Sequence, residues 1–279
     1  MKVSLWRQYG ALNSKSVFDA FEHSLVSSGW TVSHNDASAD VNVIWSVLFN
    51  GRMAGNKAVW EQGKPTIVLE VGGINRGTTW KVGLNGINRD GYFSEQGNDG
   101  TRANQLGLVC KPWRTNSDFI LICGQHDKSL QWQGMPSMGQ WLLDTIDTIR
   151  THSERPILFR PHPRCPLPTI ENEFKNVYRQ QPIQLPNSYD DFDMGFDNVH
   201  ATVSYSSNPG VHSIINGIPA FVGTSSLAYD VANDIDFMHD IEDPFMPDRT
   251  QWLNDYAHTE YTLEEISQGL PLNLLTSKL

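Results

Sequence analysis

The sequence has few cysteines, no long apolar run and fewer basic than acidic residues. Its three cysteines, Cys110, Cys123 and Cys165, have no paired spacing, which predicts reduced thiols and a cytoplasmic protein. No stretch has the apolar length that a membrane span needs, and residues 1–7 read as a strand instead of a signal peptide. The formal net charge of −10 opposes broad binding to nucleic acid or to anionic membranes, but it leaves a local basic groove open.

Several common catalytic motifs are also missing. The chain has no G-x-S-x-G elbow and no G-x-x-x-x-G-K-[ST] loop, which disfavours hydrolases and P-loop enzymes. It lacks the G-x-G-x-x-G fingerprint of dehydrogenases. The nine histidines show neither H-x₃-H nor H-E-x-x-H spacing, so no zinc site is expected.

The length of 279 residues and the 39% hydrophobic content predict a soluble α/β protein with two domains. We expect an N-terminal domain at 1–116, a C-terminal domain at 117–248 and final helices at 249–279. Expected strands lie at 3–6, 30–33, 41–47, 66–71, 119–123, 156–159, 199–205 and 218–222, and expected helices at 14–26, 53–62, 138–151, 209–217, 250–256 and 263–267. Residues 72–116 are rich in glycine and have little periodicity, so we interpret them as the wall of an acceptor site.

A strand, a serine turn and a helix follow one another from Val199. Ser206, Ser207 and Asn208 fill the turn, Pro209 suits the first helical turn, and Gly217 closes the helix. Such a turn directs hydroxyls and backbone N–H groups at one spot, which favours an anion, most often a phosphate. The alternative is an ordinary βαβ unit in which the serines only cap the helix.

A rigid basic hook follows the strand at 156–159. Its sequence is Arg160-Pro161-His162-Pro163-Arg164, and the two prolines stiffen the backbone just past the strand. Arginine forks match phosphate oxygens and a histidine can donate to one, at the strand end where open α/β sheets bind ligands. The alternative is a proline-rich surface loop with scattered charge.

A carboxylate ends the strand at 66–71. Glu70 stands just before Gly72 and Gly73, so it could act as a general base or stabilise positive charge in an oxocarbenium-like transition state. The alternative is that Glu70 pairs with Arg76 or caps the loop.

The hook and the serine unit together resemble the C-terminal domain of capsular-polysaccharide-type glycosyltransferases. The segment from Glu70 to Arg76 is similar to the E-x-G-F-x-R segment of these enzymes, with a second glycine and an isoleucine in place of the usual aromatic. The resemblance implies a GT-B-like α/β fold class, with two facing Rossmann-like domains, a central cleft and final helices that pack back towards the N-terminal domain. It also implies that the C-terminal domain holds the nucleotide part of a sugar donor.

On this resemblance we assign donor-binding and acceptor-side residues. The donor-binding residues are Gly124, Gln125, Ser129, Arg160, His162, Arg164, Ser206, Ser207 and Asn208. The acceptor-side residues are Asn75, Arg76 and Lys81, and Glu70 is the catalytic candidate. For the loop at 124–129, a plain polar turn is the alternative.

A D-x-D pair, Asp191 and Asp193, lies in the segment 189–194. Such carboxylates suit Mg²⁺ or Mn²⁺, but a solvated acidic turn is the reading we prefer, and the resemblance implies no metal and no cofactor.

We therefore expect a cytoplasmic glycosyltransferase with a nucleotide-sugar donor and a glycan acceptor. Three alternatives stay open: a phage-type transferase acting on a modified DNA base, a non-catalytic nucleotide- or glycan-binding protein, and an epimerase on the same fold. If the acceptor is DNA, the expected contacts are Arg76, Lys81, Arg89, Arg102 and Arg114.

Overall fold

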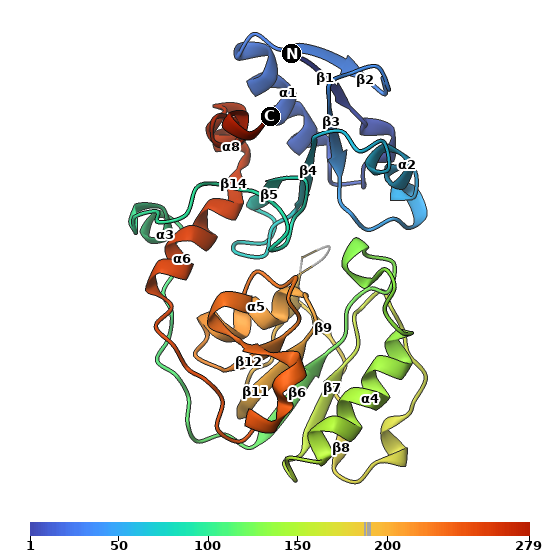
Figure 1. The fold of residues 1–279 in the computed structure, drawn as a ribbon, viewed down its shortest axis with the longest axis vertical. Coiled ribbons are helices and arrows are strands. Elements are labelled where there is room, and N and C mark those ends of the chain that lie inside the picture. The colour runs from blue at the N-terminus through green and yellow to red at the C-terminus, as the bar shows by residue number, and fades with distance from the viewer. Residues whose placement is uncertain (187, 189–190) are drawn as a thin grey trace. The chain divides into compact units, whose positions relative to one another are not determined.

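The computed structural model describes residues 1–186, 188 and 191–279, which form two compact units. Each unit is built on a six-stranded sheet with helices packed on it (Figure 1). The first unit comprises Met1–Leu108, Lys128–Leu130 and Asn254–Leu279, and the second comprises Val109–Asp127 and Gln131–Leu253. The chain therefore ends in the unit in which it begins.

The sheet of the first unit has the order β14-β5-β4-β3-β1-β2, and β1 to β4 run parallel. β5 is antiparallel to β4, and β14 is antiparallel to β5. The strands are β1 (Lys2–Leu5), β2 (Thr31–His34), β3 (Val41–Trp45), β4 (Thr66–Val71), β5 (Thr79–Leu84) and β14 (Glu260–Thr262). The helices are α1 (Lys15–Ser27), α2 (Asn56–Trp60), α3 (Thr101–Gln105), α7 (Leu263–Ser267) and α8 (Leu270–Leu275), and α6 (Thr250–Tyr256) contains the boundary between the units.

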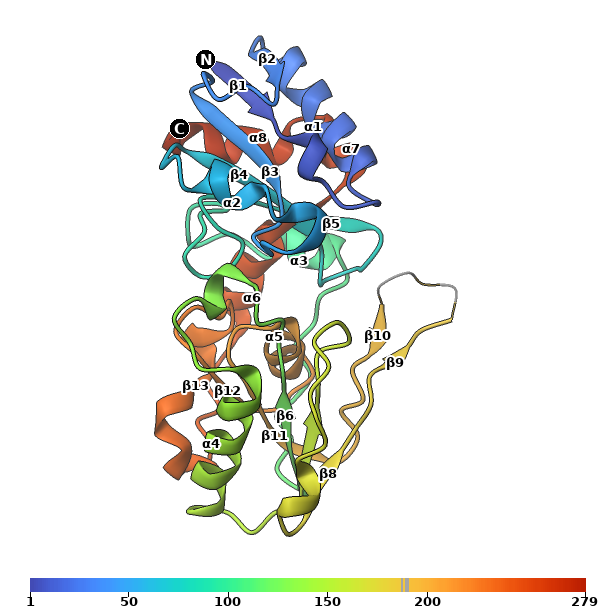
Figure 2. The ribbon, with the colours of Figure 1, turned by 90° about the vertical axis from the view of Figure 1, so that its right-hand side faces the viewer.

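Helix α1 buries the face that its spacing predicts. Val17, Phe18, Phe21 and Leu25 are all buried and pack, with α7 and α8, against one face of the sheet. Figure 2 shows α1 and α7 side by side. Each such side chain contributes about 1.5–3 kcal/mol relative to an exposed position, so this face forms the main core of the unit.

The sheet of the second unit is parallel throughout, in the order β13-β12-β11-β6-β7-β8. Helix α4 covers one face with Trp141, Leu142 and Ile146, and α5 packs against β11 and β12. An antiparallel ribbon, β9 with β10, is separate from the sheet (Figure 2). The elements are β6 (Phe119–Cys123), α4 (Met138–Arg150), β7 (Ile157–Arg160), β8 (Val177–Arg179), β9 (Ile183–Gln184), β10 (Phe192–Asp193), β11 (Val199–Ser204), α5 (Asn208–Ile215), β12 (Ala220–Val222) and β13 (Asn233–Asp234).

The predicted strands and helices are confirmed, with the largest difference in residues 72–116. This segment contains strand β5 and helix α3, which its weak periodicity did not predict. β5 has the sequence TWKVGL, in which a lysine and a glycine interrupt the apolar residues. It is nevertheless buried throughout, because β4 and β14 flank it on both sides.

Candidate functional site

The sheet of the second unit has a topological switch point between β6 and β11. From β6 the chain builds outward through β7 and β8, and it then returns to β11 on the other side of β6. In open α/β sheets, ligands bind beyond the carboxyl ends of the strands at this point. Gly124, the hook and the serine turn directly follow β6, β7 and β11, so the fold gathers them at this edge.

Gln125 and Ser206 join the ends of β6 and β11. The Ser206 backbone N–H donates to Gln125 Oε1 at 3.0 Å, and the Ser206 hydroxyl lies 3.1 Å from the same oxygen. Gln125 is buried, at 6% exposure. Two predicted donor-binding residues therefore contact each other, and their contact fixes the serine turn against β6.

Ser207 occupies the N-cap position of α5 without capping it. Its side chain makes no cap hydrogen bond, and its buried Oγ has no hydrogen-bond partner among the described residues. Helix α5 starts at Asn208, with Pro209 in its first turn. The alternative in which this serine only caps the helix is therefore wrong for Ser207. Pro209 has no N–H and the Gly210 N–H donates to the Ser207 carbonyl at 3.1 Å, so the Asn208 N–H and the Ser207 hydroxyl are the groups at this end of α5 that suit an anion.

Arg160 braces the second unit from inside. It is buried, at 7% exposure, and its Nε and Nη2 donate to Gln180 Oε1 at 3.2 and 2.6 Å. Nη2 also donates to the Gly195 carbonyl at 2.9 Å. These bonds tie the end of β7 to the loops after β8 and before β11. Donor binding by Arg160 stays a prediction, and the structure adds a structural role.

His162 has a defined tautomer when its ring is neutral. The Arg164 backbone N–H donates to His162 Nδ1 at 3.1 Å, so the ring proton is on Nε2, which can donate to an oxygen of a ligand. The ring meets that of His126 edge-on, with centroids 5.5 Å apart.

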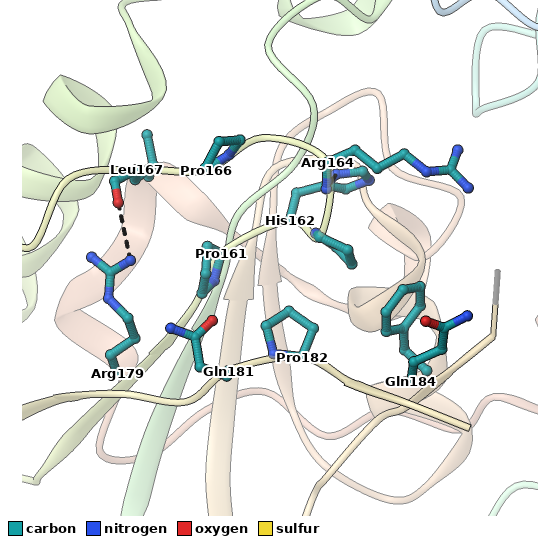
Figure 3. Close-up of a pocket in the computed structure, with 11 residues that line it drawn as sticks. Pro161, His162, Arg164, Pro166, Leu167, Arg179, Gln181, Pro182 and Gln184 are labelled. Carbon is teal, nitrogen blue, oxygen red and sulfur yellow. Dashed lines mark hydrogen bonds between the residues drawn. The ribbon is translucent and has the colours of Figure 1, made fainter. Parts of the chain in front are cut away.

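A pocket of about 640 Å³ opens beside the hook (Figure 3). In Figure 3 the hook residues lie on one side, and Gln181, Pro182 and Gln184 lie on the other. Arg179 at its wall is ion-paired with Glu171 at 2.8 Å. The remaining lining residues are Pro161, His162, Pro163, Arg164, Pro166, Leu167 and Phe192. The pocket therefore combines proline, leucine and phenylalanine side chains with about as much amide, imidazole and cationic surface.

Of the predicted donor-binding residues, Asn208 lies where it was expected, whereas Ser129 does not belong to the second unit. Ser129 belongs to the first unit, where it forms an antiparallel bridge with Leu48. Asn208 is the first residue of α5, next to Ser207. Ser129 is thus not part of the switch-point edge of the second unit, whereas Asn208 is.

In the first unit, three ionisable residues occupy neighbouring register positions on three strands. Glu70 on β4 is directly opposite Lys81 on β5, and Lys81 is directly opposite Glu260 on β14. Residues that pair in this way point to the same face of a sheet. Lys81 is 3% exposed and Glu260 is fully buried, while Glu70 is partly buried. The row of charges therefore lies mostly inside the protein.

Burial shifts the pKa of Glu70 and that of Lys81 in opposite directions, and neighbouring groups act against each shift. Burial raises the pKa of Glu70; the Ser46 hydroxyl, the Val71 N–H, Lys81 and Arg76 act against that rise. Burial lowers the pKa of Lys81, while the carboxylates of Glu260 and Glu70 raise it. A buried carboxyl group with a raised pKa beside a specific charged partner occurs at catalytic sites and in structural ion pairs alike.

Ser46 supports Glu70 from the end of β3. It is 2% exposed and has a left-handed backbone, with φ of 66°. Its hydroxyl accepts the Leu48 N–H at 3.0 Å and is hydrogen-bonded to the Glu70 carboxyl group. Sequence analysis did not find this residue, because nothing in the local pattern marks a serine in this conformation.

Glu260 holds the glycine loop that follows β4. Its Oε1 accepts the Gly73 N–H at 2.6 Å, and its Oε2 accepts the Ile74 N–H at 2.9 Å and the Thr79 hydroxyl at 2.8 Å. Glu260 therefore caps this loop, from 187 residues beyond Gly73, while Glu70 Oε1 accepts the Val71 N–H at 2.8 Å. No local pattern could have predicted a partner at that separation.

The other acceptor-side residues lie in the same turn. The Asn75 N–H donates to the Thr79 hydroxyl at 3.1 Å, and the Asn75 carbonyl accepts the Thr78 and Thr79 N–H groups at 2.9 Å each. Arg76 forms an isolated bridge with Thr79. The turn thus brings Asn75 and Arg76 next to the strand that carries Lys81.

Burial corrects the set of residues expected to contact DNA. Lys81 is buried, and Arg102 is 6% exposed, with an ion pair to Glu265 at 2.8 Å. Arg102 also lies over the Tyr261 ring, 4.2 Å from its centroid. Arg114 belongs to the second unit, where it donates to the Phe196 carbonyl at 2.7 Å. Lys81 and Arg102 stabilise the first unit from inside and are not part of a basic surface groove.

The D-x-D segment is only partly within the described residues. Tyr189 and Asp190 lie outside them. Asp191 Oδ1 accepts the Phe192 N–H at 3.0 Å, and Asp193 Oδ1 accepts the Gly195 N–H at 2.9 Å. Across the described part of the chain, no three His, Cys, Asp or Glu side chains cluster in a way that could hold a metal ion. Within the same residues, every helix is too short or too polar to cross a bilayer.

Comparison with solved structures shows the fold. KpsC of Thermosulfurimonas dismutans, a β-Kdo 2,7 transferase, matches with a TM-score of 0.54 and 14% identity over 100% of both chains. The β-Kdo 2,4 transferase of KpsC from the same organism matches with a TM-score of 0.50 and 12% identity, over 97% of this chain and 98% of that one. No family profile and no curated protein sequence matches the chain.

These similarities confirm the predicted α/β fold class of two Rossmann-like units, of the GT-B-like kind. At 12–14% identity they concern the fold alone. Function has to be argued from the residues of this chain.

Proposed function

We propose that the protein is a glycosyltransferase that takes a sugar from a nucleotide-activated donor and transfers it to a glycan. The single observation that carries the proposal is the switch-point edge of the second unit. There, Ser207 leaves a buried hydroxyl without a partner among the described residues, directly before the N-terminus of α5. The fold shared with two Kdo transferases supports a sugar as the transferred group.

The donor phosphates would bind at this edge. The N-terminus of α5, the Ser207 hydroxyl and His162 Nε2–H can each stabilise negative charge on a phosphate oxygen. When the bond from the anomeric carbon to the phosphate oxygen breaks, its electron pair stays on the phosphate. Groups held in place before that step lower its barrier, because they need no reorganisation as the charge develops.

The nucleoside part of the donor would occupy the pocket beside the hook. His162 and Arg164 belong both to the hook and to the pocket lining, so one ligand can contact both. The apolar wall, with Pro161, Pro182 and Phe192, suits the face of a base, and the side chain of Gln181 can bond to its edge.

Glu70 would act on the acceptor or the anomeric centre. As a base, it takes the proton of the acceptor hydroxyl while the hydroxyl oxygen forms its bond to the anomeric carbon. As a charge stabiliser, it faces the positive charge that develops on the sugar ring. In the first role, the raised pKa makes the Glu70 carboxylate a stronger base than an ordinary glutamate.

A donor screen tests the proposal. The full chain is mixed with CMP-, UDP- and GDP-sugars, and its melting temperature is compared with that in free monosaccharide. A donor at a hundred times its dissociation constant adds about 2.7 kcal/mol of stability, so a clear upward shift is expected for one nucleotide class. No shift with any nucleotide or nucleotide-sugar would contradict the proposal.

A further inference from the structure

Glu70, Lys81 and Glu260 form a row of alternating charge across three strands of the first unit. The register places Lys81 opposite both carboxylates, one on each side. No hydrogen bond reaches the Lys81 ammonium from the described residues, so its effect on both neighbours comes from its charge. A buried charge of this kind destabilises a protein unless opposite charges lie close to it.

Glu260 cannot change its position easily. Each of its oxygens is held by the N–H groups of Gly73 and Ile74 or by the Thr79 hydroxyl. The loop is equally constrained, because a Cβ on Gly72 would lie 2.3 Å from the Thr79 carbonyl oxygen and 2.4 Å from Glu260 Oε2. The C-terminal strand β14 thus fixes one end of the row.

We propose that Lys81 and Glu260 are positioning residues for Glu70, and that the charge of each sets how readily Glu70 gives up and takes a proton. This inference rests on the proposed function, in which Glu70 acts on substrate. Lys81 stabilises the Glu70 carboxylate directly across the β4/β5 pair, and Glu260 limits that effect because it shares the same ammonium.

Arg76, Ser46 and Tyr256 also act on this row of charges. Arg76, from the loop after β4, adds positive charge near Glu70, and the Ser46 hydroxyl contributes a hydrogen bond from the end of β3. Burial raises the pKa of the Tyr256 phenol, and the charge of Glu260 adds to that rise. These groups keep their surroundings in Lys81→Met and Lys81→Arg, whereas in Glu260→Gln the loop that carries Arg76 also loses one carboxylate oxygen as an acceptor.

The test is a titration of Glu70 in the full chain labelled with ¹³C-glutamate. The Glu70 carboxyl signal is assigned by its loss in Glu70→Gln. Lys81→Met removes the positive charge and should raise the pKa of Glu70, by about one unit. Glu260→Gln removes a negative charge and should lower the pKa of Glu70, by roughly half a unit. Lys81→Arg keeps the charge and should restore most of the wild-type value.

Lys57→Met is the matched control, because Lys57 lies in the same unit, its side chain is 54% exposed, and its ion pair among the described residues is with Glu61 at 3.8 Å. It should leave the Glu70 titration unchanged. Shifts of opposite sign in Lys81→Met and Glu260→Gln support the inference, since general loosening of the sheet would move both in one direction. Shifts of the same sign, or no shift in a folded Glu260→Gln protein, would overturn it.

The titration uses no substrate, so its outcome is separate from that of the proposed function. If the opposite shifts are seen but no donor binds, the row exists and the proposed function fails. If a donor binds and is turned over but the shifts are absent, the proposed function holds and the positioning role is wrong.

Discussion

Glu70 and Lys81 face each other directly across the antiparallel strands β4 and β5. Glu70 lies in a strand that the sequence predicts, and Lys81 lies in a segment that the sequence presents as a loop. Glu70 is assigned as the catalytic carboxylate and Lys81 as an acceptor-side residue. Their pairing places both residues in one arrangement. It also explains why Lys81 is buried, since its charge serves a neighbour and not the solvent.

Replacing Glu70 separates catalysis from stability. Glu70→Gln keeps the shape but loses the charge, so turnover should fall by roughly 10²-fold while donor affinity stays constant. Steady-state kinetics and donor titration by calorimetry measure the two effects. Wild-type turnover per folded molecule would remove Glu70 from the chemical step.

Comparison of the wild type with Glu70→Gln also tests how the stability of the protein depends on pH. Because the pKa of Glu70 is higher in the folded than in the unfolded chain, the folded protein binds more protons between the two values. Wild-type stability should therefore decline, relative to Glu70→Gln, as the pH rises above the pKa of an unfolded glutamate. Urea unfolding of both proteins from pH 4 to pH 8 checks the sign, and a difference that grows in favour of the wild type would contradict it.

The serine turn offers a comparison between two helix N-termini. Ser137 caps α4 by accepting the Gln140 N–H at 3.1 Å, whereas Ser207 makes no such bond at α5. Ser137→Ala should cost about 1 kcal/mol of stability and leave donor binding unchanged. Ser207→Ala should leave stability nearly unchanged and weaken donor binding by about tenfold. Loss of stability in Ser207→Ala with wild-type donor affinity would make this serine structural.

Two residues of the hook should differ in the same way, with Arg160 contributing to stability and His162 to donor binding. Arg160→Ala leaves Gln180 Oε1 and the Gly195 carbonyl without their donor, so it should destabilise the protein by roughly 1–3 kcal/mol. His162→Ala removes a hydrogen bond to the Arg164 N–H within the hook, and we expect it to weaken donor binding while the melting temperature stays within a few degrees. Calorimetric titration beside a melting curve measures both. A stable Arg160→Ala protein would contradict the bracing role.

Alanine at Gly72, in the loop after β4, should affect stability differently from alanine at Gly139 in α4. Gly72→Ala should destabilise the first unit by roughly 1–3 kcal/mol, because the new methyl group meets the Thr79 backbone and Glu260. Gly139→Ala in α4 is the control, since a Cβ there has no neighbour within 4 Å and alanine favours a helix. Urea unfolding measures both, and equal stability of the two variants would contradict the loop geometry.

Much of the fold was predictable because strands β4 and β6 are short apolar runs that end at polar turns. Both have the bounds that the sequence predicts. The groups at the ends of β6, β7 and β11 were predictable as well, since the carboxyl ends of parallel strands share one edge. What sequence could not show is which of these groups the fold itself uses. From the sequence, Arg160 is expected to contact a ligand. In the structure, Gln180 and Gly195 accept its hydrogen bonds.

The row of charges was beyond sequence reasoning for a different reason. β14 has three residues, and its register against β5 joins parts of the chain that are far apart. No local sequence pattern marks Lys81 as a buried lysine, because glycine interrupts its strand. No local pattern marks Glu260 as its partner either. Only the pairing of three strands brings Glu70, Lys81 and Glu260 together.

The measurement that tests the account most directly is sugar transfer itself. The donor selected by thermal shift is incubated with the full chain and with oligosaccharide acceptors, and products are detected by mass spectrometry beside the released nucleotide. The account predicts a glycan whose mass rises by one sugar, formed about 10²-fold more slowly by Glu70→Gln than by the wild type although both bind the donor equally. Tight donor binding with no transfer to any acceptor would contradict it and leave a nucleotide-binding protein on a glycosyltransferase fold.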